Sequence, residues 1–275
     1  YEGQIVLGEL IRTLDPAAIR GRVIILPAAN LPAARAGARV SPLDGGNLNR
    51  AFPGDADGTP TWQIAHYIAD VLVPMADLFV DLHAGGSSLN YQPFVSLSLT
   101  GVDEVDRRAM AAARAFGAPR IMVWGKAEAT GTSSAAALRH GVPKLGGEYG
   151  GAGVVSRSGV ALVRRGVQNL MAHMGIVDGT PVRAEEPRLM EIRDRGDYAY
   201  APAEGVFAAA VELGQPVAPN DVIGHVHAPE HPERPPLAVT IGRGGVVVCL
   251  RAIGRVEAGD CLAHLAGDRA DPFAP

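Results

Sequence analysis

The spacing of hydrophobic positions in the first two thirds of the chain alternates between two kinds of pattern. Some stretches repeat apolar residues three and four positions apart, as amphipathic helices do: 3–14, 61–76, 102–116, 133–140 and 158–175. Short apolar runs, typical of strands covered on both faces, lie between them: 22–27, 77–83, 120–124 and 142–149. This alternation predicts an α/β domain with a parallel or mixed sheet and helices on both faces.

The pattern changes near residue 185. From about residue 198 onward no helical period remains, and Gly and Pro turns separate short apolar runs. Such a pattern is typical of a small all-β unit. The polar stretch 178–197 is expected to connect the two units. We therefore predict an α/β domain over 1–185, followed by a linker and C-terminal β domain over 186–275.

Composition narrows the classes of function. The 275 residues are 47% hydrophobic and 20% charged, which supports a packed core. The formal net charge is −4 and no basic stripe is present, so nucleic acid is not an expected partner. No apolar run reaches the roughly 18 residues of a membrane helix, so no membrane is expected either. Cys249 and Cys261 lack the further Cys/His pair of a zinc site and require no oxidising compartment.

One predicted strand ends in LFVDLHAGG, at 78–86, where a histidine precedes two glycines. Ligands of open α/β sheets bind at the carboxyl ends of strands, and His83 falls at such an end. Asp81 lies two positions earlier on the same face, where a carboxylate can orient a metal-binding histidine. Gly85 and Gly86 let the backbone approach a ligand closely. The alternatives are a core histidine and, for Asp81, a helix cap or a buried pair.

The segment DGGNLNRAFPG, at 44–54, is a turn-rich polar loop. Arg50 offers a planar fork that matches a carboxylate, and Asn49 supplies a neutral donor beside it. Phe52 interrupts the polar run, which indicates a loop packed onto the body of the protein. Arg39 precedes the loop and could stabilise an oxyanion. The alternatives are a solvated turn and a surface arginine.

The segment LGGEYGGAG, at 145–153, places Glu148 at the end of an apolar strand with glycines on both sides. A carboxylate in that position can act as a general base if its pKa and position are tuned. No Gly-Lys-Ser/Thr follows the glycines, so the segment is not a phosphate-binding P-loop. The alternative for Glu148 is a turn residue that faces solvent.

Together and in this order, NLNRAFPG, VDLHAGG and GGEYGG resemble segments of the succinylglutamate desuccinylase/aspartoacylase family, a branch of the zinc carboxypeptidase superfamily. The resemblance covers almost the whole chain. It implies a zinc-carboxypeptidase-like mixed sheet flanked by helices and a small C-terminal all-β domain, similar to a barrel-sandwich. A lipoyl- or biotinyl-type carrier role is not expected, because the tail contains no lysine. The fuller strings SPLDGGNLNRAFPG and DLHAGGSSLNY look most like N-acetyl-diaminobutyrate deacetylases.

The resemblance implies hydrolysis of the amide bond of a small N-acyl amino acid, with one Zn2+ per chain. His83 would be a zinc ligand, and the metal would acidify a water and polarise the amide carbonyl. Glu148 would be the general base, and Asn49 and Arg50 would bind a substrate carboxylate. Arg39 is assigned to the oxyanion, although its spacing to Asn49 differs from that of aspartoacylase.

The remaining zinc ligands of this family come from a His-x-x-Glu element, written HGDE or HGNE. In bacterial relatives Tyr-Glu-Gly follows it, and this chain begins with Tyr1, Glu2 and Gly3. The pair is therefore expected to lie before Tyr1, and Glu2 is expected to be an ordinary residue of the first helical turn. The other histidines are expected to be structural or exposed: His66, His140, His173, His225, His227, His231 and His264.

Two rival classes of function remain open. One is a metal-free small-molecule binding protein on the same fold, and the other is a zinc carboxypeptidase that acts on peptides. The resemblance to bacterial enzymes of amino-acid metabolism implies a cytoplasmic location. No signal peptide is visible, but the chain begins at Tyr1 and upstream sequence is expected, so targeting is not decided. The sequence also leaves open whether the chain forms a homo-oligomer.

Overall fold

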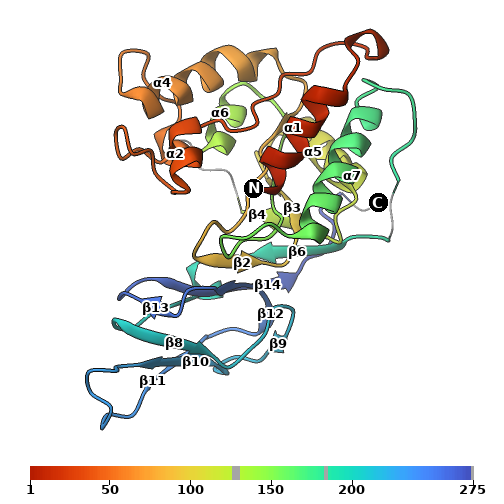
Figure 1. Cartoon of the computed structure of the whole chain (residues 1–275). Helices are drawn as coiled ribbons and strands as arrows, with labels where there is room; N and C mark the ends of the chain where they lie inside the picture. Colours follow the sequence, from red (N-terminus) through yellow and green to blue (C-terminus); the bar gives the residue numbers. More distant parts are fainter. Residues whose placement is uncertain (126–130, 183–184, 274–275) are drawn as a thin grey trace.

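The first part of the chain folds into a mixed sheet flanked by helices (Figure 1). The structure is a computed structural model that describes residues 1–125, 131–182 and 185–273. The strands of this part lie in the order β1-β5-β3-β4-β6. Their bounds are β1 (Phe79–Val80), β3 (Phe94–Ser98), β4 (Arg120–Trp124), β5 (Lys144–Glu148) and β6 (Arg188–Ile192). β5 is parallel to β1 and antiparallel to β3, whereas β4 is parallel to both β3 and β6. The predicted α/β class with a mixed sheet is confirmed.

The helices form two groups in Figure 1. In the first group α5 packs on α7, on β3 and on β5, and α1 packs on α7. In the second group α3 packs on α4, while α2 and α6 lie close by. The bounds are α1 (Glu2–Thr13), α2 (Leu31–Ala36), α3 (Leu48–Ala51), α4 (Pro60–His66), α5 (Asp103–Phe116), α6 (Ser133–Arg139) and α7 (Arg157–His173). The predicted helices 3–14, 102–116, 133–140 and 158–175 are confirmed to within two residues.

Several shorter helical turns complete these groups. The predicted helix at 61–76 begins as α4, continues as a π-helical segment over Tyr67–Leu72 and ends in a 3-10 turn over Val73–Met75. Two further 3-10 turns lie at Pro16–Ala18 and Arg195–Asp197. None of the helices within the described ranges is long and apolar enough to cross a membrane.

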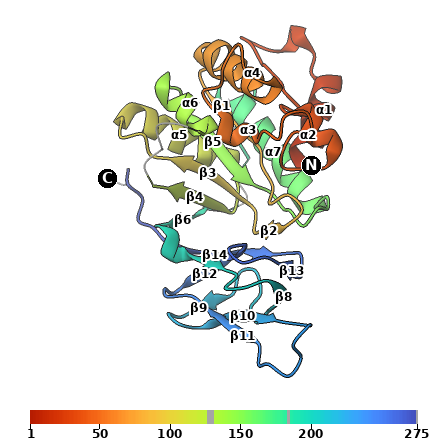
Figure 2. The same ribbon diagram turned by 90° about the vertical axis from the view of Figure 1, so that its left-hand side faces the viewer.

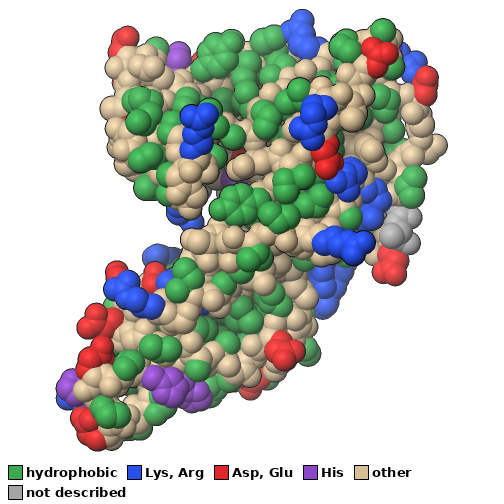
Figure 3. Space-filling model, in the orientation of Figure 1, with side chains coloured by type: hydrophobic (Ala, Val, Ile, Leu, Met, Phe, Trp, Pro, Cys, Tyr) green, Lys and Arg blue, Asp and Glu red, His purple; other side chains and the backbone are tan. Residues whose placement is uncertain are grey.

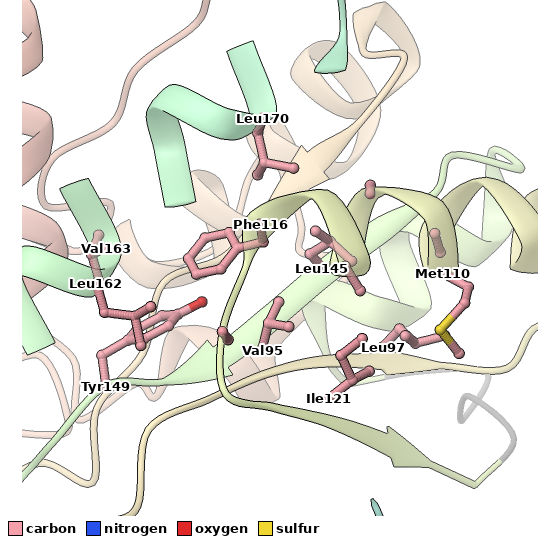
Figure 4. Packing of buried hydrophobic residues seen from close by; sticks show 14 of the residues in the cluster. Val95, Leu97, Met110, Phe116, Ile121, Leu145, Tyr149, Leu162, Val163 and Leu170 are labelled. Atoms are coloured by element: carbon pink, nitrogen blue, oxygen red, sulfur yellow. The ribbon is translucent and has the colours of Figure 1, made fainter. Parts of the chain in front are cut away.

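A hydrophobic core lies between the sheet and the first group of helices (Figure 4). The rings of Phe116, at the end of α5, and Tyr149 stack with their centroids 5.6 Å apart. Gly166 of α7 makes room for this pair, because a Cβ there would lie 2.3 Å from the Phe116 ring. Tyr149 follows Glu148 directly, so the core anchors the backbone that carries the predicted general base.

The prediction of a strand at 22–27 is wrong. This segment has no regular secondary structure and pairs with no strand in the part of the chain that the structure describes. Ile24 and Leu26 are each 44% exposed. An apolar, branched run favours the extended backbone of a strand, but only a neighbouring strand can complete one, and the run cannot predict that neighbour.

Three strands of the sheet were not predicted from the sequence: two lie before residue 100, and the third, β6, lies in the predicted polar connection. β3 lies in the middle of the sheet and is almost entirely buried, while β2 (Leu89–Tyr91) pairs with a strand of the C-terminal unit. In β3 the serines Ser96 and Ser98 interrupt the apolar run, so no continuous hydrophobic signal marks it. β2 is too short to show any period.

The second part of the chain is an all-β unit, as predicted (Figure 2). Its four-stranded sheet has the order β11-β10-β8-β13 and faces a second layer that contains β12 and β14. The bounds are β7 (Tyr198–Tyr200), β8 (Gly205–Ala209), β9 (Pro216–Val217), β10 (Val222–His227), β11 (Leu237–Thr240), β12 (Gly245–Arg251), β13 (Arg255–Val256) and β14 (Cys261–Asp268).

The two units share one continuous sheet. β14 pairs with β6 of the α/β part, and β12 pairs with β2. β6 lies inside the stretch 178–197, which was predicted only as a polar connection, so part of that stretch is a sheet strand. Through β2 the C-terminal unit supports the chain that follows His83. The domain boundary at 185/186 stays a prediction.

Candidate active site

The parallel ends of β1 and β5 bring two predicted site residues side by side. Beyond the last paired residues of β1, the His83 N–H donates to the carbonyl of Gly147 at 3.0 Å. The Tyr149 N–H in turn donates to the His83 carbonyl at 3.2 Å, so His83 and Glu148 occupy neighbouring positions. This meeting of strand ends confirms the prediction that His83 falls at a carboxyl edge of the sheet.

A carboxylate fixes the orientation of the His83 ring. His83 Nε2 lies 2.8 Å from Asp81 Oδ2, and the Ser133 hydroxyl donates to the same oxygen at 2.6 Å. Lys144 Nζ lies 3.6 Å from it. Burial alone would raise the pKa of Asp81, but the charges of His83 and Lys144 hold it well below its usual range. Asp81 is therefore a charged partner that holds Nε2 and leaves Nδ1 of His83 for another contact.

Glu148 has the environment of a general base. Burial raises the pKa of its carboxyl to about 7, against the opposing effect of the His83 charge. Its Oε2 atom is buried and has no hydrogen-bond partner among the residues that the structure describes. A buried, unpartnered carboxylate oxygen with a pKa near neutrality can take up and release a proton. The alternative of a turn residue facing solvent does not fit this burial.

The two glycines after His83 have different structural reasons. A Cβ on Gly85 would lie 2.2 Å from the Leu89 carbonyl oxygen, so Gly85 is required by the close approach of β2. Gly86 has a φ of +64°, a left-handed conformation that glycine adopts without strain, and faces open space. Both therefore shape the turn between β1 and β2. The sequence had suggested that both serve the approach of a ligand.

The loop 44–54 is packed down on the body of the protein, as predicted. Phe52 is 5% exposed, and its carbonyl accepts the Gly131 N–H at 2.9 Å. The side-chain oxygen of Asn49, in α3, accepts the backbone N–H of Ser133 at 2.8 Å. Arg50 is exposed, and its Nη1 donates to the Asn49 carbonyl at 2.6 Å. The loop thus presents a fixed amide beside a free guanidinium.

Asp44 anchors this loop to the first turn of α4. Its carboxylate accepts the Thr61 N–H at 2.7 Å, the Thr61 hydroxyl at 2.8 Å and the Thr59 hydroxyl at 2.8 Å. It also accepts the Gly46 N–H at 2.9 Å. These bonds, the one from the Thr61 backbone foremost, hold the pKa of Asp44 well below its usual range.

Asp44→Ala is expected to lower the melting temperature, because it releases the loop that carries Asn49 and Arg50. Since the folded-state pKa of Asp44 is depressed, its contribution to stability is complete above about pH 4 and is lost as the pH falls further. Thermal melts of Asp44→Ala and of the exposed control Asp57→Ala, from pH 7 down to pH 3, measure this. Equal melting temperatures of the two variants at pH 7 would contradict the anchoring role.

Arg39 is exposed, and its positive charge affects the pKa of Glu148. The positive charge of Arg39 is among the influences that lower the pKa of Glu148, after the larger effects of burial and of His83. The structure therefore brings Arg39 toward the site that the sequence predicted for it. Its assignment to an oxyanion stays a prediction.

Sequence reasoning missed three residues of this site. The prediction that Glu2 is an ordinary first-turn residue is wrong. Glu2 is 1% exposed, and its Oε1 accepts the N–H of Ser156, the N-cap residue of α7, at 2.8 Å. Ser133 and Lys144 both contact Asp81, as described above. Lys144 had a signal, because it is one of two lysines in the chain and begins an apolar strand.

His83, Asp81 and Glu148 are of the types and in the arrangement expected beside a bound metal ion. A histidine whose Nε2 is held by a carboxylate is the usual arrangement of a metal-binding imidazole. The orphaned oxygen of Glu148 at the next strand end suits a base beside the metal. Within residues 1–125, 131–182 and 185–273, however, no group of three His, Cys, Asp or Glu side chains could hold a metal ion. The role of His83 as a metal ligand therefore stays a prediction.

A carboxylate-backed histidine lies at the edge of the mixed sheet beside Glu148, whose Oε2 atom is buried without a hydrogen-bond partner among the described residues. Such a pairing is typical of the active site of an enzyme. The family profile "Succinylglutamate desuccinylase/Aspartoacylase catalytic domain" matches residues 1–174. The chain is also 38% identical, over 267 residues, to the N-alpha-acetyl-L-2,4-diaminobutyric acid deacetylase of Halomonas elongata. That match covers 97% of this chain and 78% of the relative. The chain therefore belongs to the succinylglutamate desuccinylase/aspartoacylase family, whose members hydrolyse amides.

Solved structures agree with this assignment. A succinylglutamate desuccinylase/aspartoacylase from Rhodobacter sphaeroides superposes with a TM-score of 0.93 at 38% identity, covering 98% of this chain and 82% of that one. The product-bound ectoine utilization protein EutE (DoeB) from Ruegeria pomeroyi has a TM-score of 0.93 at 35% identity. In that comparison 97% of this chain and 81% of the other are covered. The resemblance inferred from three short segments is confirmed.

Proposed function

We propose that this protein is a zinc-dependent deacylase that hydrolyses N-acetyl-diaminobutyrate to acetate and diaminobutyrate. The observation that carries the proposal is the pairing of Asp81-oriented His83 with the buried carboxylate of Glu148 at neighbouring strand ends. The names of the Halomonas and Ruegeria relatives support the choice of substrate. As the relatives are bacterial, we place the reaction in the bacterial cytoplasm.

His83 would hold the metal through Nδ1, because Asp81 engages Nε2. The resemblance to the family assigns the remaining ligands to a His-x-x-Glu pair preceding Tyr1. Zinc, when bound, would supply a Lewis acid that acidifies water and polarises the amide carbonyl. One Zn2+ per chain is expected.

Glu148 would take the proton from the attacking water at Oε2 and pass it to the leaving amine nitrogen. Its position suits this transfer, because Oε2 is buried and has no partner within the described part of the chain. A pKa near 7 allows the same carboxyl to accept and then release the proton. Arg39 would stabilise the negative charge that develops on the amide oxygen.

Asn49 and Arg50 would hold the carboxylate of the substrate. The guanidinium of Arg50 is exposed, and a bidentate pair with a carboxylate would give both affinity and orientation. The amide of Asn49 is fixed through its oxygen, so its N–H2 group can donate to the same carboxylate. In Figure 3, side chains of Lys and Arg are visible around the notch between the α/β part and the β unit.

A panel of N-acyl amino acids tests the substrate assignment. We expect N-acetyl-diaminobutyrate to have the highest kcat/KM of a panel that includes N-acetylaspartate, N-succinylglutamate and N-acetyllysine, assayed by release of the free amine. A place among the poorest substrates would overturn this choice. Cleavage of C-terminal dipeptides without activity on the panel would favour a peptidase, and binding without turnover would favour a metal-free binding protein.

A further inference from the structure

The first residue of α6 lies between the two segments that carry the proposed metal ligand and the proposed carboxylate site. α6 begins at Ser133, which is 2% exposed. The residue before it, Thr132, is the cap, and its side chain accepts the Ala135 N–H at 3.2 Å. The cap is thus supplied by Thr132, and both the N–H and the hydroxyl of Ser133 are free to bond outside the helix.

Ser133 uses these two groups in two directions. Its N–H donates to Asn49 Oδ1 at 2.8 Å, and its hydroxyl donates to Asp81 Oδ2 at 2.6 Å. Asn49 belongs to α3, whereas Asp81 follows β1. One buried residue therefore bonds directly to both parts of the proposed active site.

Each bond fixes the orientation of a group that faces the substrate or the metal. Because the N–H of Ser133 occupies the amide oxygen of Asn49, the amide nitrogen is the end left to donate. Asp81 Oδ2 also binds His83 Nε2 at 2.8 Å, so the Ser133 hydroxyl limits the positions that Asp81, and with it the His83 ring, can take.

We propose that Ser133 is a positioning residue that holds Asn49 and, through Asp81, His83 in their working orientations. It thereby couples the site for the substrate carboxylate to the metal-binding histidine. This inference rests on the function proposed above. It assigns a role to a residue that touches neither substrate nor metal.

Three substitutions at this position separate the two bonds. Ser133→Ala removes only the hydroxyl, and Ser133→Thr keeps it. Ser133→Pro removes both the hydroxyl and the N–H, at the first helical position, where proline is tolerated. The preceding Thr132 has φ −118° and ψ 161°, an extended conformation that suits a residue before proline. The matched control is Ser134→Ala, since the Ser134 hydroxyl contacts Lys144 and bonds to neither Asn49 nor Asp81.

The zinc dissociation constant, measured by chelator competition on the full-length protein, reports on the bond to Asp81. We expect it to rise several-fold in Ser133→Ala, which is less than the roughly 10–100-fold for loss of a direct partner of the ligand, because Ser133 acts on His83 only through Asp81. The KM for N-acetyl-diaminobutyrate should stay near that of the parent. Ser133→Thr should restore the parent zinc affinity, and Ser134→Ala should match the parent throughout.

The KM reports on the bond to Asn49. Ser133→Pro should match Ser133→Ala in zinc affinity but have a KM about tenfold higher, because the Asn49 amide would no longer be held in place to donate to the charged substrate carboxylate. The difference in KM between Ser133→Pro and Ser133→Ala should vanish when each substitution is made in an Asn49→Ala background. If Ser133→Pro does not fold, Asn49→Asp replaces it: this variant keeps an acceptor for the Ser133 N–H but loses the amide donor. Its KM should rise by at least as much, because the new carboxylate also repels the carboxylate of the substrate.

The outcomes separate this inference from the proposed function. A parent that binds zinc and turns over N-acetyl-diaminobutyrate, with Ser133→Ala equal to it in zinc affinity, would overturn the positioning role alone. Equal KM values for Ser133→Pro and Ser133→Ala, or an unchanged KM in Asn49→Asp, would overturn the coupling to Asn49. A parent that neither binds zinc nor turns over the substrate would overturn the proposed function, and this inference with it.

Discussion

Glu148→Gln is expected to reduce kcat by about 10³-fold or more, within the upper part of the range for removal of a general base. Glutamine keeps the size of the side chain and its place at the end of β5, but it cannot accept a proton at Oε2. Zinc content and KM should change little, because Glu148 is assigned neither to the metal nor to the substrate carboxylate. Steady-state kinetics with N-acetyl-diaminobutyrate, together with elemental analysis of the same preparation, measure both quantities.

The control for this variant is Glu104→Gln, an exposed glutamate in the first turn of α5. It should retain the turnover of the parent. If Glu148→Gln kept turnover within about tenfold of the parent with its zinc intact, another group would have to take the proton. The base role of Glu148 would then be wrong.

His83→Ala is expected to abolish both metal binding and turnover. In the proposed site the imidazole of His83 is a metal ligand, and removing a ligand should weaken zinc binding by more than the roughly 10–100-fold lost with an outer-sphere partner. The fold should persist, because the His83 backbone, which bonds to Gly147 and Tyr149, is not altered. Chelator competition and circular dichroism on the variant check the two expectations.

His173→Ala is the matched control, because His173 is exposed at the end of α7. It should bind zinc and turn over substrate like the parent. Full zinc binding by a folded His83→Ala protein would remove His83 from the metal site. His83 would then be a partly exposed residue that pairs with Asp81 for structural reasons.

The fold could be predicted where a segment carries its own signal. The helices α1, α5, α6 and α7 each have an apolar stripe, and the C-terminal strands alternate with turns, so their positions follow from local pattern. The strand β3 and the coil at 22–27 could not be predicted, because each depends on a neighbour distant in sequence. Two serines conceal a buried strand in the first case, and in the second no strand pairs with an apolar segment among the described residues.

The residues proposed to act on the substrate could be predicted from the sequence, but the residues that hold them in position could not. His83 and Glu148 stand at strand ends next to glycines, and Asn49 and Arg50 adjoin in a turn, so residue type and place indicate their chemistry. Ser133 is an ordinary residue at a helix start, and only the three-dimensional arrangement shows it between Asn49 and Asp81.

Glu2 shows the limit of a local rule. An acidic residue in the first turn of a helix ordinarily favours the exposed N-terminus through the helix dipole. Here the side chain turns inward and bonds to the N-cap residue of α7, so it ties α1 to the chain that follows Glu148. That partner is 154 positions away in sequence, beyond the reach of any local pattern.

The most direct test of the central claim is the zinc content per chain of the full-length protein, measured by elemental analysis after metal-free purification and reconstitution with zinc. The proposed function predicts about one zinc per chain, lost in His83→Ala and retained in Glu148→Gln. A protein that folds but takes up no zinc under these conditions would contradict the account. It would leave His83, Asp81 and Glu148 as a partly buried polar cluster in a metal-free binding protein.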